Sequence, residues 1–298
     1  MKRSRAILLS AVVFATNQAT SRADAWLQKR GEGLAIYSLN IQSHNTVNSI
    51  GQFDKSRRIQ QVQHSIYGEF GLTNRLTIGG KILATDNMLN RHNSVFSKNI
   101  KRSFGLNSGL LFTRLGLIRN SEIVALSLVT AIETPSYYHS NIASYYGLKK
   151  WQYETRAELG ININKNNFLV FGAGYHGNIN HWYDEVRFDV LYGHYFIPEL
   201  LFMVRFQKYV YIVKNKHKAV MSYGKFNVSV FDFLTKSGFA KLTMSFATNV
   251  SDHVVVEVGG YSSIKSKLTF TQKLNIQLYG GFASVWVKFQ FVLTKSLI

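Results

Sequence analysis

The stretch at residues 151–163, WQYETRAELGINI, alternates between two kinds of side chain. One set is mostly apolar or aromatic: Trp151, Tyr153, Thr155, Ala157, Leu159, Ile161 and Ile163. The other set is mostly polar: Gln152, Glu154, Arg156, Glu158, Gly160 and Asn162. Successive side chains of a β-strand point to opposite faces, so the stretch predicts a strand with one apolar and one charged face. Such a strand suits a wall with lipid on one side and a wet interior on the other.

The same period recurs along the chain and predicts an all-β protein. We expect strands at residues 33–43, 60–72, 75–85, 104–115, 122–132, 151–163, 168–178, 182–194, 199–212, 238–248, 253–263 and 278–291. Their lengths are close to the ~9–11 residues that a tilted membrane-spanning strand needs. Residues 220–233 also alternate, so a count of 14 strands stays open beside the expected 12.

The connections between these strands fall into two classes. Short, turn-like connections alternate with mostly long ones at 44–59, 86–103, 133–150, 213–237 and 264–277. This asymmetry is typical of transmembrane antiparallel up-and-down β-barrels, which have short periplasmic turns and long outer loops. An even strand number places both termini on the periplasmic side. The alternative, a soluble β-sandwich, gives no reason for loop lengths to segregate in this way.

Aromatic residues gather near the ends of the expected strands. Trp151, Tyr153, Tyr175 and Trp182 lie next to long loops, and Phe70 and Phe291 lie near the opposite ends. Two aromatic girdles, one at each interface, are expected for a membrane barrel.

The N-terminus has the features of an export signal. Lys2, Arg3 and Arg5 precede an apolar run at residues 6–15 that is too short to span a bilayer, and Ala23-Asp24-Ala25 fits a cleavage site. We expect residues 1–25 to be a signal peptide and residues 26–298 to form one barrel in the outer membrane of a Gram-negative bacterium. The chain has no cysteine, which excludes disulfides, and only two prolines.

Three segments resemble a known family. Residues 25–33, AWLQKRGEG, are similar to the start of mature chains in a poorly characterised family of outer-membrane β-barrels. That family is grouped with channel proteins of the phenol-degradation meta pathway. Residues 67–79, YGEFGLTNRLTIG, and residues 241–260 extend the similarity over nearly the whole mature chain. The resemblance implies a barrel and brings no catalytic residues. One departure is that residues 292–298 follow Phe291, where such barrels usually end on an aromatic residue.

The inward faces of the expected strands carry a candidate constriction of six acidic and six basic residues. These are Glu69, Lys81, Glu154, Arg156, Glu158, Glu185, Arg187, Asp189, Arg205, Lys241, Glu257 and Lys288. Gly172 and Gly174 leave space for Arg156 and Arg187 to reach across. The set fits a filter that selects solutes by charge and width. It equally fits an ion-pair network that braces the barrel, which we favour, and a braced lumen can still conduct.

Two functions follow, and strand number does not choose between them. About eight strands fill their own interior, whereas 16–18 leave an open channel. The leading expectation is a passive channel for small solutes with no enzymatic step. The alternative is a structural or surface-interaction barrel with a plugged lumen, whose basic loops bind lipopolysaccharide or a partner.

The net charge of +19 comes mainly from the expected outer loops. Clusters there include Lys55, Arg57 and Arg58, and also Lys214, Lys216 and Lys218. A basic rim would attract lipopolysaccharide phosphates, although a solvated loop surface explains it as well. An exported barrel argues against nucleic acid as the partner.

The remaining charges and histidines offer little chemistry. Arg114 and Lys208 are expected to face lipid near strand ends, where a charge costs ~0–1 kcal/mol rather than the ~2–4 kcal/mol of the midplane. A hydrolase needs a base beside its nucleophile, but His64 is expected on the opposite face from Ser65. His176, His181 and Asp184 have no recognised metal-ligand spacing. We therefore expect no enzyme, cofactor or metal site.

Overall fold

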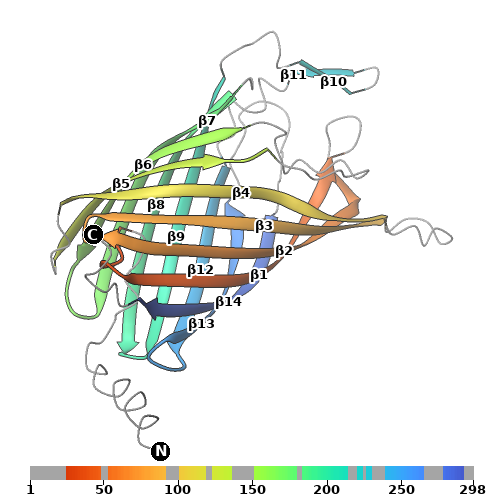
Figure 1. Ribbon diagram of the computed structural model, residues 1–298. Helices are drawn as coiled ribbons and strands as arrows, with labels where there is room; N and C mark the ends of the chain where they lie inside the picture. Colours follow the sequence, from red (N-terminus) through yellow and green to blue (C-terminus); the bar gives the residue numbers. More distant parts are fainter. Residues whose placement is uncertain are drawn as a thin grey trace, which may run out of the picture.

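Each of the twelve stretches expected to form strands does so in the computed structural model. The structure describes residues 25–47, 53–91, 101–118, 123–135, 151–179, 183–213, 220–223, 226–229, 239–264 and 278–291. Within them, twelve antiparallel strands close into one barrel, as Figure 1 shows. The strands are β1 (Glu32–Val47), β2 (Phe53–Thr73), β3 (Leu76–Arg91), β4 (Lys101–Ile118), β5 (Val124–Glu133), β6 (Gln152–Asn162), β7 (Asn167–Asn178), β8 (Tyr183–Ile197), β9 (Leu200–Val213), β12 (Phe239–Asn249), β13 (Val254–Ile264) and β14 (Leu278–Gln290). The all-β barrel prediction is confirmed.

The barrel closes where β1 pairs with β14, so neither edge of the sheet is left open. The stretch that alternated at residues 220–233 forms β10 (Val220–Tyr223) and β11 (Phe226–Ser229), a separate two-stranded sheet outside the barrel wall (Figure 1). The count of 12 is therefore confirmed, and 14 is wrong. Among the described residues, no helix is long and apolar enough to cross a membrane.

The first four strands run farther toward the long loops than expected. β1 continues to Val47 and β2 begins at Phe53, so most of the loop expected at residues 44–59 is strand. β3 and β4 likewise take in much of residues 86–103. The expected signal peptide up to residue 24 and the tail at 292–298 lie outside the described residues.

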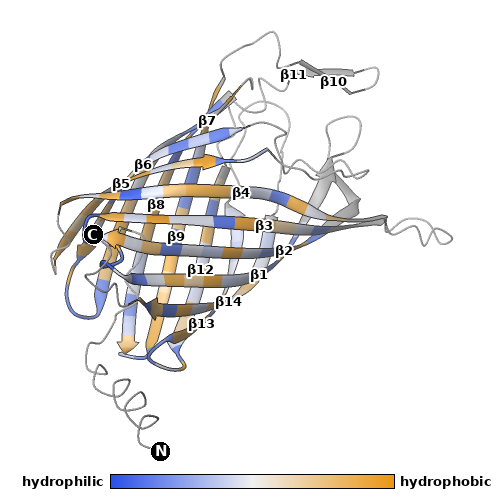
Figure 2. Cartoon of the chain, in the orientation of Figure 1, coloured by the Kyte–Doolittle hydropathy of each residue, from blue (hydrophilic) through white to orange (hydrophobic). Residues whose placement is uncertain are grey.

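The outer wall is apolar, as the alternation predicted. Ile66, Ile82 and Leu111 are each more than half exposed, and apolar and polar bands alternate along the strands in Figure 2. Aromatic rings lie at both ends of this wall. At the long-loop end Tyr153 and Tyr175 have ring centroids 6.1 Å apart. At the short-turn end a row of rings includes the pairs Phe70–Phe291, Phe196–Phe202 and Phe202–Phe246. An exposed apolar wall between two aromatic belts is the surface that a bilayer covers.

A β-bulge in β4 exchanges the two faces of that strand. Asn107 is an extra residue, because the residues on its two sides pair with consecutive residues of β3. Before the bulge Phe104 is 68% exposed on the outer face, whereas after it Phe112 and Arg114 are buried on the inner face. The expectation that Arg114 faces lipid is wrong, because one inserted residue shifts a period-two pattern by one position.

The segment that precedes β1 lies inside the short-turn end of the barrel. Trp26 and Leu27 are buried, and Gln28 reaches Glu69 of β2. We call residues 26–28 the N-terminal plug. A Cβ added to Gly160 would lie 2.6 Å from the Trp26 ring, so the glycine is needed for this close approach. Trp26 also packs edge-on against Phe168, with ring centroids 6.3 Å apart.

The plug belongs to the hydrophobic core of the protein, which is a layer across the lumen. Inward-facing apolar side chains from six strands complete this layer: Ala125, Phe168, Val170, Leu191, Leu201, Met203, Ala247 and Val255. Most charged inward residues lie on the long-loop side of this layer, whereas Lys288 lies at the short-turn end, in register with Leu34. The interior is therefore divided into a largely apolar, filled half and a charged half.

Candidate functional site: the charged lumen

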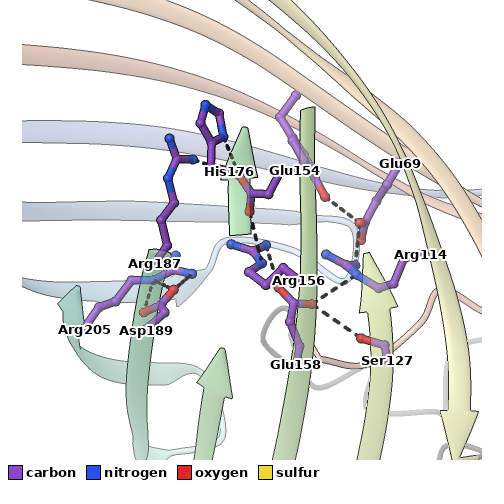
Figure 3. A network of polar contacts seen from close by, with 11 residues as sticks. Glu69, Arg114, Ser127, Glu154, Arg156, Glu158, His176, Arg187, Asp189 and Arg205 are labelled. Atoms are coloured by element: carbon purple, nitrogen blue, oxygen red, sulfur yellow. Dashed lines mark hydrogen bonds and ion pairs between the residues drawn. The ribbon is translucent and has the colours of Figure 1, made fainter. Parts of the chain in front are cut away.

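Inward side chains of five neighbouring strands form a continuous row. Arg114, Val129, Arg156, Gly174 and Arg187 are successive cross-strand partners from β4 to β8. Because residues in register share a face of the sheet, three arginines point into the lumen together. Ion pairs connect them to carboxylates of the same strand and of strands two positions away (Figure 3).

Gly174 is required where it stands in this row. A Cβ added there would lie 2.8 Å from the Cβ of Arg156 and 3.0 Å from its Cγ. The glycine therefore makes room for the Arg156 side chain. Part of the space expected at Gly172 and Gly174 is thus taken by Arg156.

One part of the charge network is fully buried and centres on Arg114. Its Nη1 lies 3.0 Å from Oε2 of Glu69, and its Nε lies 3.4 Å from Oε2 of Glu158. Tyr67 donates a hydrogen bond to Glu69 at 2.6 Å, and Gln28 of the plug donates another at 2.5 Å. This part of the network joins β2, β4, β6 and the plug, and it braces the barrel.

The other part of the network is accessible from the lumen. Arg187 bridges Glu154 and Glu185, each at 2.8 Å. Arg205 binds Asp189 at 2.5 Å. The side chains of Arg156, Arg187 and Arg205 are 24%, 29% and 31% exposed, respectively. The carboxylates of Glu154, Glu185 and Asp189 are only 12–13% exposed. The arginines therefore cover the acids and present cationic surface to the lumen.

The other predicted lumenal residues lie on the remaining wall. Lys81 is exposed and pairs in register with Tyr67. Lys241 places its Nζ 3.9 Å from the ring centroid of Tyr261. Glu257 and Lys288 are half-buried, with cross-strand neighbours Ser284 and Leu34. The twelve predicted residues thus all lie on inward faces, but only those of β2 and β6 to β9 join the network of Figure 3.

Sequence reasoning missed three inward charges or titratable groups. Arg114 was missed because the β-bulge at Asn107 reverses the faces of the residues that follow it. Glu133 lies just beyond the expected end of its strand, and it pairs in register with Leu110 and Gln152. His176 accepts or donates hydrogen bonds to Glu154 at 3.3 Å and Gln152 at 2.6 Å. The parity of β7 could have found His176, since its neighbour Tyr175 was expected to face outward.

Among the described residues, the histidines and nearby acids do not form a metal site, and His181 lies outside these residues. His176 faces the lumen, whereas Asp184 accepts a hydrogen bond from Tyr175 on the outer face. Outward-facing His64 contacts the hydroxyl of Tyr37 at 2.9 Å. Within the described ranges, no group of three or more His, Asp or Glu is placed to hold a metal ion.

Comparison with known proteins identifies which solved structures share this fold. No known family profile and no curated protein matches the sequence. The barrel is similar to an outer-membrane channel from Pseudomonas putida F1, with a TM-score of 0.64, 8% identity, and coverage of 90% of this chain and 99% of that one. It is also similar to the translocator domain of the autotransporter NalP from Neisseria meningitidis, with a TM-score of 0.50, 6% identity, and coverage of 95% and 96%. The NanC porin aligns at a TM-score of 0.48 and 8% identity, over 84% of this chain and all of that one. At these identities the similarity shows that the chain has the fold of bacterial outer-membrane barrels.

Proposed function

We propose that the chain is a channel of the bacterial outer membrane through which small solutes pass passively. The supporting observation is the exposure of Arg156, Arg187 and Arg205, at 24–31%, inside a closed barrel. A lumen filled by its own side chains would leave these groups no accessible surface. The long-loop half is therefore a wet passage, and its charges select solutes by sign and width.

The surface of the barrel supports the proposed location. An apolar outer wall suits lipid, and a cleaved signal peptide at residues 1–25 would direct export. The basic clusters expected in the outer loops suit lipopolysaccharide phosphates. The side chains of those clusters lie outside the described part of the structure, so lipopolysaccharide binding rests on sequence alone. No enzymatic step is part of the proposal.

The apolar layer favours a second candidate, a barrel with a permanently plugged lumen. Trp26 and Leu27 fill the short-turn half together with the inward side chains of six strands. If that layer never opens, the protein serves as a structural or surface-interaction barrel. The two candidates differ only in whether the N-terminal plug leaves its place.

The way the N-terminal plug is attached favours a plug that can leave the lumen. Cleavage after Ala25 would make Trp26 the first residue, so the plug would be a free chain end. The buried indole N–H of Trp26 has no hydrogen-bond acceptor in the described part of the chain, and a buried unsatisfied donor costs about 1–3 kcal/mol. The side chain of Gln28 anchors the plug through a hydrogen bond to Glu69.

A reversible tether distinguishes the two candidates. Leu27→Cys and Gly116→Cys are made together, because the Cγ of Leu27 lies 3.7 Å from the position of a Cβ on Gly116. The chain has no cysteine of its own, so an engineered pair reports on this contact alone. Processed protein is purified from outer membranes, and single-channel conductance is measured in a planar bilayer.

For the channel, we expect conductance that is lost on oxidation and restored by reductant. Arg156→Ala or Arg187→Ala should alter the conductance, whereas Lys208→Ala should not. Lys208 is a matched control because it lies on the outer face, opposite exposed Phe188. Conductance no higher than leak in the untethered, reduced protein would favour the plugged barrel instead.

A further inference from the structure

We propose that Lys81, Arg205 and Lys241 form a binding site for a small oxyanion in the lumen. The ligand chemistry is that of a carboxylate or phosphate group. The inference rests on the proposed function, because it names the class of solute that the wet half of the lumen accepts.

Two of the three cations lie on adjoining strands, and the third faces the lumen from another part of the wall. Lys81 is on β3, Arg205 on β9 and Lys241 on β12, and β3 lies five positions from β12 around the closed ring. All three face inward. Arg205 pairs in register with Thr243, two residues from Lys241, so Arg205 and Lys241 are diagonal neighbours on the inner face. The charge of Lys81 also acts on Lys241, and that of Arg205 acts on Lys81.

Carboxylates neutralise this group only in part. Asp189 accepts hydrogen bonds from Nε and Nη2 of Arg205 at 2.8 and 2.5 Å. Glu133 acts on Lys81 by its charge, and Asp189 acts on Lys241. Of these carboxylates, Asp189 forms an ion pair, with Arg205. Lys241 makes no ion pair within the described ranges, and it rests on an aromatic ring instead of a carboxylate.

Lys241 lies over an aromatic ring that is itself held by hydrogen bonds. The Tyr261 ring lies under its ammonium group, with 3.9 Å between Nζ and the ring centroid. The Tyr261 hydroxyl lies 2.8 Å from Oδ1 of Asn40 and 2.9 Å from Oε1 of Gln42, and both oxygens can accept its hydrogen. A cation held over an aromatic face keeps its charge but gains no anionic partner. An anion entering the lumen would supply that partner.

The site is open to a ligand that travels in the lumen. Lys81 is exposed, and Arg205 keeps 31% of its side chain accessible. Mutual repulsion of the three cations falls when an anion binds among them, and charge-assisted hydrogen bonds to oxyanions are strong. Three other acids pair with arginines outside the site: Glu154 and Glu185 with Arg187, and Glu158 with Arg156.

Ion selectivity tests the site in a conducting channel. With a KCl gradient across a planar bilayer, we expect a reversal potential that shows preference for chloride. Inorganic phosphate should reduce the chloride current. The double variant Lys81→Gln with Lys241→Gln should lose the preference and weaken phosphate block tenfold or more. Lys241→Arg keeps the charge and should retain both properties, and Lys208→Gln, on the outer face, should behave as the unmodified protein.

Direct binding separates this inference from the proposed function. Phosphate is titrated calorimetrically into the detergent-solubilised protein. Phosphate binding that is lost in the double variant supports the site even if the barrel does not conduct. A conducting barrel with no preference for anions, whose phosphate block is unchanged by Lys81→Gln and Lys241→Gln, overturns the site and leaves the channel standing. Absence of phosphate binding in the unmodified protein also overturns it.

Discussion

Arg114 Nη1 lies 3.0 Å from Glu69 Oε2, and both side chains are only 5% exposed. The same guanidinium also contacts Glu158, which is 2% exposed. One cation thus neutralises carboxylates of two strands, β2 and β6, from its place on β4. An ion pair this deeply buried is sensitive to the loss of one partner, because the remaining charge stays desolvated.

Arg114→Ala should therefore destabilise the barrel strongly. Removal of one partner of a buried pair costs about 3–5 kcal/mol. The midpoint of heat-induced unfolding in detergent should fall clearly below that of the unmodified protein. Arg156→Ala is the matched control, since Glu158 keeps Arg114 and Glu154 keeps Arg187 when Arg156 is removed. Equal effects of the two substitutions would contradict a special role for Arg114.

Gly160→Val should dislodge the N-terminal plug. The added side chain would meet the Trp26 ring, which lies 2.6 Å from the position of a Cβ. Overpacking of this kind typically costs about 1–3 kcal/mol, so the free end of the chain is expected to move. Single-channel conductance should rise. Gly68→Val is the control, because the nearest heavy atom to its added Cβ is the carbonyl oxygen of Leu34 at 4.0 Å. Unchanged conductance in Gly160→Val would show that the plug does not gate the barrel.

Deletion of Asn107 should prevent correct assembly. The deletion removes the bulge, so the six residues that precede it in β4 would exchange faces relative to β3. Phe104 would then enter the wet lumen. We expect loss of the folded, heat-modifiable form from the outer-membrane fraction. Asn107→Ala keeps the residue count and should fold. Normal folding of the deletion variant would mean that the register of β4 is not set by the bulge.

Hydrolysis of membrane lipid should be absent from the purified protein. His64 has the Tyr37 hydroxyl as its hydrogen-bond partner, and Ser65 lies in register with Ser38 on the lumenal face. A base and a nucleophile on opposite faces of one strand cannot act together. Release of fatty acid from phospholipid vesicles should equal the background, both before and after His64→Ala. Hydrolysis that His64→Ala abolishes would establish an enzyme.

Much of the charged lumen could be read from alternation alone. Glu154, Arg156 and Glu158 were placed inward because their neighbours Tyr153, Thr155 and Ala157 formed the opposite face. The same argument placed Glu185, Arg187 and Asp189. The argument failed at Arg114. Alternation assigns the faces correctly only while the register of the two strands is unbroken, and the extra residue Asn107 shifts that register. It could not find Glu133, since the end of its strand is set by pairing with β4 and β6.

The sequence by itself determined the strands and their faces, because each depends on a period of two between neighbouring residues. It also determined the number of strands in the wall to within one hairpin. Only the tertiary structure decided that β10 and β11 stay outside the barrel, that Trp26 lies against Gly160, and that Arg205 is a diagonal neighbour of Lys241. These relationships join residues that are distant in the chain, and they depend on how the sheet closes and which strands then face each other across the lumen.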